Sequence, residues 1–342
     1  MIGAGELLRS PAWYPLGSAP GGGVDLVRLE EADYREASFL DERLLARPRA
    51  RMAIEAAPIE EAAAAGVPRA HYLFHIGHVG STLISRLIGD HAGFFALREP
   101  RLLRLLADSR LGAPPLALRT TLTLLSRTWH PGQRAVIKAT SLVNDLAPAI
   151  LDEDPTAAAV LIHVDPLAYL RGIMAGANSR REIEALAPAR LARLAGHLAQ
   201  FDAAANADPV ALERTLQPRS EGERVAMSWL CELLALRRTA LAHAGRTRWL
   251  NFDAFLEDPR GGLAAILGAL GTEPSPEALR TLLASPWMHR YSKAPEHAYD
   301  ARLRREVLAA ADHEHGAEIR RGLAWIEAAA RYEPIRSLLA PQ

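Results

Sequence analysis

A glycine-rich segment, His75-Ile-Gly-His-Val-Gly-Ser-Thr82, joins a short apolar run to a helical pattern. Glycines let the backbone turn tightly and bring successive amide N–H groups close to an anion, and the helix dipole adds attraction. The hydroxyl groups of Ser81 and Thr82 are further donors. We therefore predict an anion-binding loop made of Gly77, His78, Val79, Gly80, Ser81 and Thr82. A structural turn between strand and helix, without a ligand, is the alternative.

The loop differs from two well-known catalytic loops. Gly80 runs directly into Ser81, whereas loops that hydrolyse ATP or GTP place a lysine before the Ser or Thr. The segment also lacks the glycine that follows the nucleophile in Gly-x-Ser-x-Gly hydrolases. These differences disfavour magnesium-dependent NTP hydrolysis and serine hydrolysis. A side chain at Gly80 is expected to block the approach of a phosphate to the backbone.

A lysine follows another apolar run, in Val136-Ile-Lys138-Ala-Thr140. A lysine at the end of a strand beside an anion-binding loop neutralises negative charge that develops on a leaving oxygen. The alternative is a surface lysine whose charged end reaches solvent.

The block from His78 to Glu99 resembles the sulfotransferase loop, in which a basic residue, x, Gly, Ser/Thr and Thr precede a helix and a glutamate. Glu99 stands at the same distance beyond His78 as the base glutamate of tyrosylprotein sulfotransferases does beyond its loop residue. Lys138 resembles the strand-end lysine of cytosolic sulfotransferases. The resemblance implies Glu99 as general base, Lys138 as stabiliser of the leaving group and His78 as the loop's basic residue. It implies 3′-phosphoadenylyl sulfate (PAPS) as donor, 3′-phosphoadenosine 5′-phosphate (PAP) as product, and no metal.

The sequence departs from this family at the donor's 3′-phosphate. Val164 stands where the family has an arginine, and Gly172 stands where it has a serine. Arg171 is assigned to the donor in their place, with Arg180 and Arg181 beyond the helix as the alternative, and Lys293 is assigned to a late basic loop that covers the donor. His78 replaces the usual lysine or arginine, and a histidine carries positive charge only when protonated. The missing contacts leave open a different donor or a loss of activity.

The elements around these residues follow an α/β pattern. Helical stretches separate five short apolar runs, at residues 72–76, 94–97, 135–137, 159–164 and 248–252. Buried runs that alternate with helices predict a three-layer P-loop-type parallel sheet flanked by helices. Leu83, Ile84, Leu87 and Ile88 mark one helical face after the loop. We expect a domain over residues 70–342, a helical elaboration at about 180–245 with its longest helix at 221–243, and an irregular N-terminal arm over 1–69.

Composition limits the remaining classes. The 40 basic and 40 acidic residues cancel, so no whole-chain field attracts nucleic acid or a membrane surface. Cys231 is the only cysteine, in an apolar helical pattern, and is predicted to fill the core. Twelve histidines include no His-Glu-x-x-His, so no metal is expected. The run 302–305 is interpreted as an exposed helix face, and a basic contact to a donor or an acceptor is the alternative. The absence of a leader pattern or a long apolar stretch predicts a cytoplasmic protein.

These features together predict a sulfotransferase that transfers a sulfuryl group from PAPS to a hydroxyl or an amine. Two alternatives stay open: a phosphotransferase on the same fold, and a nucleotide-binding protein without catalysis. The sequence specifies neither the acceptor nor the oligomeric state.

Overall fold

A five-stranded parallel sheet forms the centre of the computed structural model, which describes residues 2–108, 111–201, 209–292, 296–332, 335–336 and 339. The strand order is β5-β6-β4-β7-β8, with β4 in the middle, so each predicted apolar run is confirmed as a strand. The strands are β4 (Ala70–His75), β5 (Phe94–Arg98), β6 (Arg134–Lys138), β7 (Ala159–His163) and β8 (Thr247–Asn251). All six residues of β4 are buried, which is typical of a central parallel strand.

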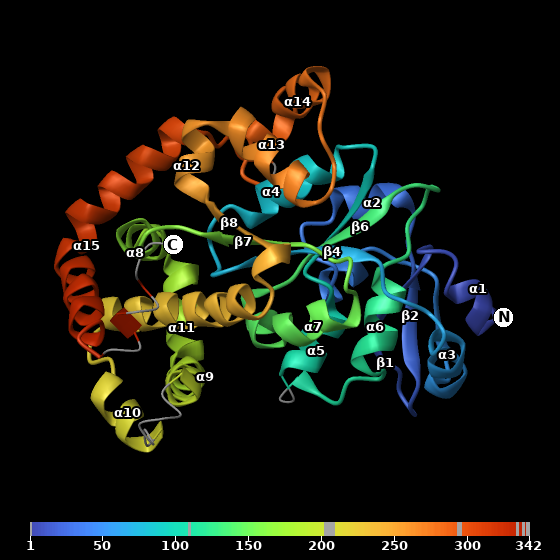
Figure 1. Cartoon of the computed structure of the whole chain (residues 1–342), viewed down its shortest axis with the longest axis horizontal. Coiled ribbons are helices and arrows are strands. Elements are labelled where there is room, and N and C mark those ends of the chain that lie inside the picture. Colours follow the sequence, from blue (N-terminus) through green and yellow to red (C-terminus); the bar gives the residue numbers. More distant parts are fainter. Residues whose placement is uncertain are drawn as a thin grey trace.

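Helices cover both faces of this sheet, which confirms the three-layer α/β prediction (Figure 1). One face carries α4 (Ser81–Gly89) and α13 (Pro259–Ala269). The opposite face carries α5 (Arg101–Ala107), α6 (Leu118–Leu125), the short η3 (Ser141–Leu146) and α7 (Ala147–Glu153). The predicted helical face of α4 is buried at Leu83, Ile84, Leu87 and Ile88.

The helical elaboration lies to one side of the sheet, at the left of Figure 1. Its helices are α8 (Pro166–Met174), α9 (Ala177–Phe201), α10 (Pro209–Leu216), α11 (Glu221–Ala242) and the C-terminal α15 (Ala301–Ala329). Ser220 caps α11 by accepting a hydrogen bond from the Glu223 backbone, which fixes the predicted start of this helix. The prediction that it is the longest helix of the region was wrong, because α9 has 25 residues and α11 has 22. Helix α9 continues through Pro188, a residue type that usually marks a helix end. Helices α11 and α15 touch closely at Gly222, where a Cβ atom would lie 1.9 Å from the Glu318 carbonyl oxygen.

The N-terminal segment is more regular than its sequence suggested. It forms an antiparallel sheet of β1 (Trp13–Ser18), β2 (Val24–Arg28) and β3 (Arg51–Ile54), with α1 (Ala4–Leu7), α2 (Glu31–Glu36), η1 (Glu42–Ala46) and α3 (Ala56–Ala63). The expectation of an irregular arm was therefore wrong. Pro15 is tolerated because β1 is an edge strand, and the register shift between Pro15 and Gly17 interrupts the alternation that would have marked the strand.

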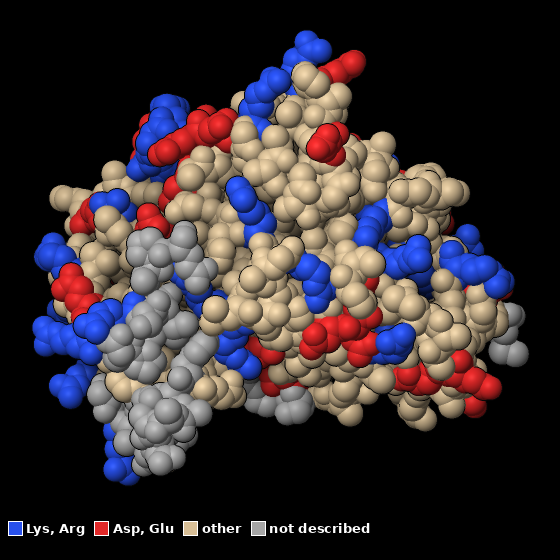
Figure 2. All heavy atoms as spheres, viewed as in Figure 1, with Lys and Arg blue, Asp and Glu red and all other residues tan. Residues whose placement is uncertain are grey.

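The chain after β8 folds back over the end of the central sheet. It contributes α12 (Phe252–Glu257), α14 (Pro276–Leu283) and η5 (Pro286–His289) before α15 begins, and η4 (Ala244–Arg246) precedes β8. Figure 2 shows basic and acidic side chains interspersed over the face that it presents. Among the described residues, no helix is both long enough and apolar enough to cross a membrane.

Candidate active site

The glycine-rich loop follows β4 and leads into α4, as predicted. Gly77 and Gly80 have φ angles of 84° and 69°, a left-handed backbone that glycine adopts without strain. Gly80 occupies the N-cap position, so no side chain satisfies the first amide groups of α4. The Thr82 side chain is buried there, and its Oγ1 atom has no hydrogen-bond partner among the described residues. The free backbone N–H groups at the start of α4 and the Thr82 hydroxyl can therefore donate hydrogen bonds to a bound anion.

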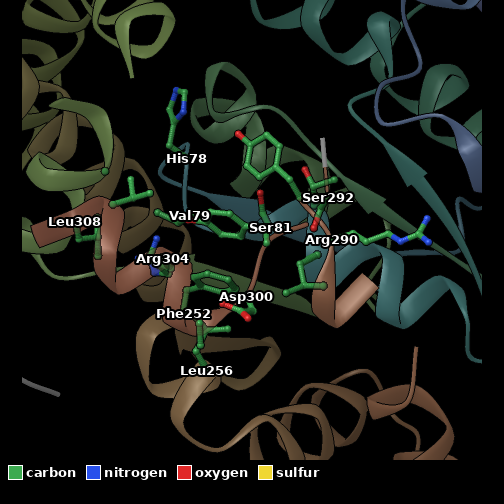
Figure 3. Close-up of a pocket in the computed structure, with 18 of the residues that line it drawn as sticks. His78, Val79, Ser81, Phe252, Leu256, Arg290, Ser292, Asp300, Arg304 and Leu308 are labelled. Atoms are coloured by element: carbon green, nitrogen blue, oxygen red, sulfur yellow. The ribbon is translucent and has the colours of Figure 1, made fainter. Parts of the chain in front are cut away.

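A cavity of about 280 Å³ opens over this loop (Figure 3). Its floor is the segment from His78 to Leu83, and its walls come from helices α8, α9, α12 and α15 and from the chain around η5. The walls include Gly172, Ser179, Phe252, Trp287, Arg290, Ser292 and Arg304. The loop therefore faces a cavity built from segments that are far apart in the sequence.

The Phe252 ring covers Gly80. A Cβ atom on Gly80 would lie 2.0 Å from the ring, a distance that no side chain contact allows. The expectation that a side chain at Gly80 meets the phosphate directly is therefore corrected, because it meets Phe252 first. A substitution at Gly80 would disturb the packing of α12 as well as the loop.

Glu99 and Lys138 lie together at the ends of the neighbouring strands β5 and β6. The Glu99 backbone N–H donates to the Lys138 carbonyl oxygen at 2.7 Å, and Lys138 Nζ donates to a Glu99 carboxylate oxygen. The Lys138 side chain is fully buried, whereas that of Glu99 is 13% exposed. The alternative of a surface lysine is therefore wrong. Neither residue is among the described residues that line the cavity.

His78 and Glu99 share an unusual backbone conformation. Their φ angles are 54° and 51°, and they are the non-glycine residues with positive φ in the part of the chain that the structure describes. This conformation is uncommon for residues other than glycine, although Asn, Asp and His adopt it more often than the rest, and such strain concentrates at functional sites. Two positions that the resemblance marks as functional thus carry the strained backbone. Their catalytic roles stay predictions.

The His78 ring is oriented toward α9 rather than toward the cavity wall formed by α12. Its Nδ1 atom lies 3.4 Å from Ser179 Oγ, and its Nε2 atom lies 3.4 Å from a Glu182 carboxylate oxygen. Figure 3 shows the ring pointing away from Phe252 and Arg304. His78 therefore contributes its backbone to the floor, while its side chain joins the loop to α9.

The residues that the resemblance assigns to the donor's 3′-phosphate, or to the loop that covers the donor, are not among the described residues whose side chains line the cavity. Arg171 Nε donates to Asp312 of α15 at 2.9 Å, and Arg171 is not among the described residues that line the cavity, so its assignment requires this ion pair to open. Lys293 lies outside the described residues. Val164 is buried, and its carbonyl accepts a hydrogen bond from Trp229 Nε1 at 3.0 Å. Gly172 lines the cavity but offers no side chain.

Sequence reasoning did not include Arg304 among the site residues, although it left a basic contact from the run 302–305 open. The run 302–305 was interpreted as an exposed helix face, and this holds for Arg302, whose side chain is 74% exposed. Arg304, in contrast, lines the cavity with a side chain only 12% exposed. The signal was available, because Arg304 and the apolar Leu308 are four residues apart and so share one helix face.

Other sequence predictions concern the core and metals. Cys231 is buried, as predicted, and burial raises the pKa of its thiol to about 12. Within the described ranges, no three His, Cys, Asp or Glu side chains gather closely enough to hold a metal ion.

Three solved structures to which this chain is similar are sulfotransferases. No protein-family model and no curated protein matches the sequence. The sulfotransferase domain from the curacin biosynthetic pathway is 12% identical, with a TM-score of 0.40, and the match covers 76% of this chain and 98% of that domain. Mouse sulfotransferase SULT7A1, solved with PAP, is 13% identical with a TM-score of 0.42 and coverage of 79% and 88%. Sulfotransferase STF9 from Mycobacterium avium is 13% identical with a TM-score of 0.36 and coverage of 73% and 77%.

Proposed function

We propose that this protein is a sulfotransferase that binds PAPS in the loop cavity and transfers its sulfuryl group to a hydroxyl or an amine. The observation that carries the proposal is Thr82. Its hydroxyl is buried and unpartnered at the uncapped start of α4, on the floor of a cavity. Burying a hydroxyl without a partner costs free energy, and a bound phosphate or sulfate oxygen would supply the missing partner.

The reaction would use the ends of three adjacent strands. The loop after β4 holds the 5′-phosphosulfate. Lys138 is the last residue of the neighbouring strand β6, and Glu99 directly follows β5, the next strand of the sheet. The acceptor oxygen or nitrogen attacks sulfur, the bond from sulfur to the bridging oxygen of the donor breaks, and the acceptor proton passes to the Glu99 carboxylate. Lys138 stabilises the charge left on the bridging oxygen of PAP. Catalysis of this type depends mainly on positioning and charge stabilisation.

One observation favours a second candidate, a nucleotide-binding protein without catalysis. Lys138 is fully buried and hydrogen-bonded to Glu99, and neither lines the cavity among the described residues. In that case the pair serves stability alone. A phosphotransferase is less well supported, because the loop lacks the lysine that nucleoside triphosphate loops place before Ser81.

The test is a calorimetric titration with PAP and with ATP, each with and without magnesium. We expect PAP to bind without magnesium and ATP to bind much more weakly. Thr82→Val keeps the side-chain shape and removes the hydroxyl, so PAP affinity should fall by about 10-fold, the effect of one lost hydrogen bond. Its melting temperature should stay the same or rise, because no partner is lost.

Ser85→Ala is the matched control. Ser85 lies on the same helix, and its Oγ atom is also buried and unpartnered, but it is not among the described residues that line the cavity. PAP affinity should therefore be unchanged in this variant. Magnesium-dependent binding of ATP in preference to PAP would contradict the proposed donor, and equal effects of the two substitutions would remove the loop from the site.

A further inference from the structure

The chain lacks the arginine and the serine from which the resemblance expects the second phosphate to be bound, because Val164 and Gly172 stand in their places. Val164 is sealed in the core, with its carbonyl bonded to Trp229, and Gly172 has no side chain. A doubly phosphorylated nucleotide placed here with only the loop as partner would leave one phosphate without a counter-charge. A buried charge without a partner is costly, so another residue must supply the positive charge.

Arginine side chains from the C-terminal part of the chain line the cavity at two places. Arg290 extends away from Phe252 and Arg304 in Figure 3. Arg304 lies near the start of α15. Its Cζ atom is 5.5 Å from the centre of the Phe252 ring, and this ring covers Gly80 of the loop. Of the two arginines, Arg304 is thus the one placed beside the loop.

Arg304 also lies on the side of the cavity that faces Gly172. Leu308, one turn further along α15, places its Cδ2 atom 4.0 Å from the position of a Cβ atom on Gly172. Residues four apart share a helix face, so Arg304 and Leu308 face the same wall. The wall of α8 and α9 opposite them consists of small residues, Gly172, Ala175, Gly176 and Ser179. A phosphate can occupy such a space between small side chains and a guanidinium group.

We infer that Arg304 binds the second phosphate of the donor, so that the C-terminal helix α15 completes the nucleotide site. The inference rests on the proposed function, because it concerns the same cavity and the same donor. The ligand chemistry is a nucleoside bisphosphate, whose two anionic groups contact the loop and Arg304. A guanidinium group suits this role because it binds phosphate through two parallel hydrogen bonds.

Asp253 keeps Arg304 in place when the site is empty. Arg304 donates from Nε and Nη2 to one Asp253 carboxylate oxygen, at 3.1 and 2.7 Å. Asp253 is 36% exposed, so water can solvate its carboxylate when a phosphate takes over part of the guanidinium group. Asp300 also lines the cavity, but its carboxylate accepts a hydrogen bond from the Leu303 backbone and caps α15.

The experiment compares PAP with AMP, which lacks the 3′-phosphate, by calorimetry on four proteins. The wild type should bind PAP more tightly than AMP. Arg304→Gln should lower PAP affinity by about 10- to 100-fold, as expected for a lost charge-assisted hydrogen bond, and leave AMP affinity nearly unchanged. Arg302→Gln is the control on the same helix, because Arg302 is exposed and pairs with Glu306. Asp253→Asn retains the Arg304 charge and should retain the preference for PAP.

The outcomes separate this inference from the proposed function. A wild-type preference for PAP that persists in Arg304→Gln overturns the role of Arg304 and leaves the proposed donor intact. Equal binding of PAP and AMP by the wild type overturns the site for a second phosphate. Binding of neither nucleotide overturns both the donor and the inference. Loss of PAP affinity in Arg302→Gln to the same extent as in Arg304→Gln also contradicts the inference, because a general change in surface charge would then explain it.

Discussion

The main-chain N–H of Glu99 donates to the Lys138 carbonyl, and the Lys138 ammonium group donates back to the Glu99 carboxylate. The two residues are therefore joined twice, once through the backbone and once through the side chains. Lys138 is fully buried, so the Glu99 carboxylate is the counter-charge that allows an ammonium group at this depth. Any change at Glu99 thus acts on stability as well as on chemistry.

Glu99→Gln should lower turnover by about 10²- to 10⁴-fold, because a positioned base is removed. It should also lower the free energy of unfolding by about 3 kcal/mol, because the buried ammonium group loses the negative charge of the carboxylate that it contacts. PAP affinity should stay unchanged. The double variant Glu99→Gln with Lys138→Met removes both charges, and we expect it to regain stability but not activity. Melting curves, PAP titrations and turnover assays check these results, and turnover within a few-fold of wild type in Glu99→Gln would contradict the base assignment.

Arg86 of α4 connects this helix to the end of α2 and to the chain around η5, which forms one wall of the cavity. Its guanidinium group donates to the carbonyl oxygens of Arg35 and Glu36 at the end of α2 and to the Ser292 carbonyl, at 3.0 to 3.2 Å. It also lies 4.0 Å from the centre of the Trp287 ring. Ser292 and Trp287 line the cavity. Arg127 holds other N-terminal carbonyls, those of Leu7, Ser10 and Trp13, without touching the cavity.

Arg86→Lys and Arg127→Lys form a matched pair. Each loses several hydrogen bonds from a buried guanidinium group, so each should lower the free energy of unfolding by about 2 kcal/mol. Only Arg86→Lys should weaken PAP binding, by about 10-fold, because it loosens Trp287 and Ser292, which line the cavity. Chemical denaturation and calorimetry at a temperature where both variants are folded provide the measurement. A similar loss of PAP affinity in Arg127→Lys would show that general stability, not the position of Arg86, decides binding.

His71 should make the protein sensitive to mild acid. Its Nδ1 atom accepts a hydrogen bond from the Ala158 backbone at 3.0 Å, and burial, with a smaller contribution from Arg134, lowers the pKa of the imidazole to about 4. The unfolded chain, with a pKa near ~6.5, binds more protons than the folded chain between these values. The stability due to neutral His71 is therefore fully present above pH ~6.5 and lost as the pH falls toward 4, by about 3 kcal/mol over the window.

The measurement is denaturation of the wild type and His71→Gln between pH 7 and 4. Glutamine keeps an acceptor but gains no proton, so the variant should lose less stability in acid. His297→Gln is the control, because the His297 side chain is 72% exposed. An equal acid dependence for wild type and His71→Gln would show that other groups determine it.

The sequence by itself determined the central layers and the loop. The apolar runs that became β4 to β8 are continuous and flanked by helical patterns, and this pattern arises from burial on both faces of a parallel sheet. The glycines at 77 and 80 marked the left-handed turns because few other residues adopt that backbone without strain. Each of these features depends on neighbours in the chain, so a local pattern suffices to predict it.

Tertiary structure alone decided which residues meet. Residues 252, 287 and 304 line one cavity although they belong to three different elements, α12, η5 and α15, and helices α13 and α14 lie between the first two in the chain. No local sequence pattern encodes contacts over such a separation. The pairing of Lys138 with Glu99 required the register of β5 against β6, which sets Arg98 opposite Lys138. The β1–β3 sheet was not predicted because a bulge in β1 interrupts the alternation of apolar and polar residues that marks a strand. A contact between distant segments forms through packing of the whole chain, and its free energy is shared among residues that no single stretch of sequence contains.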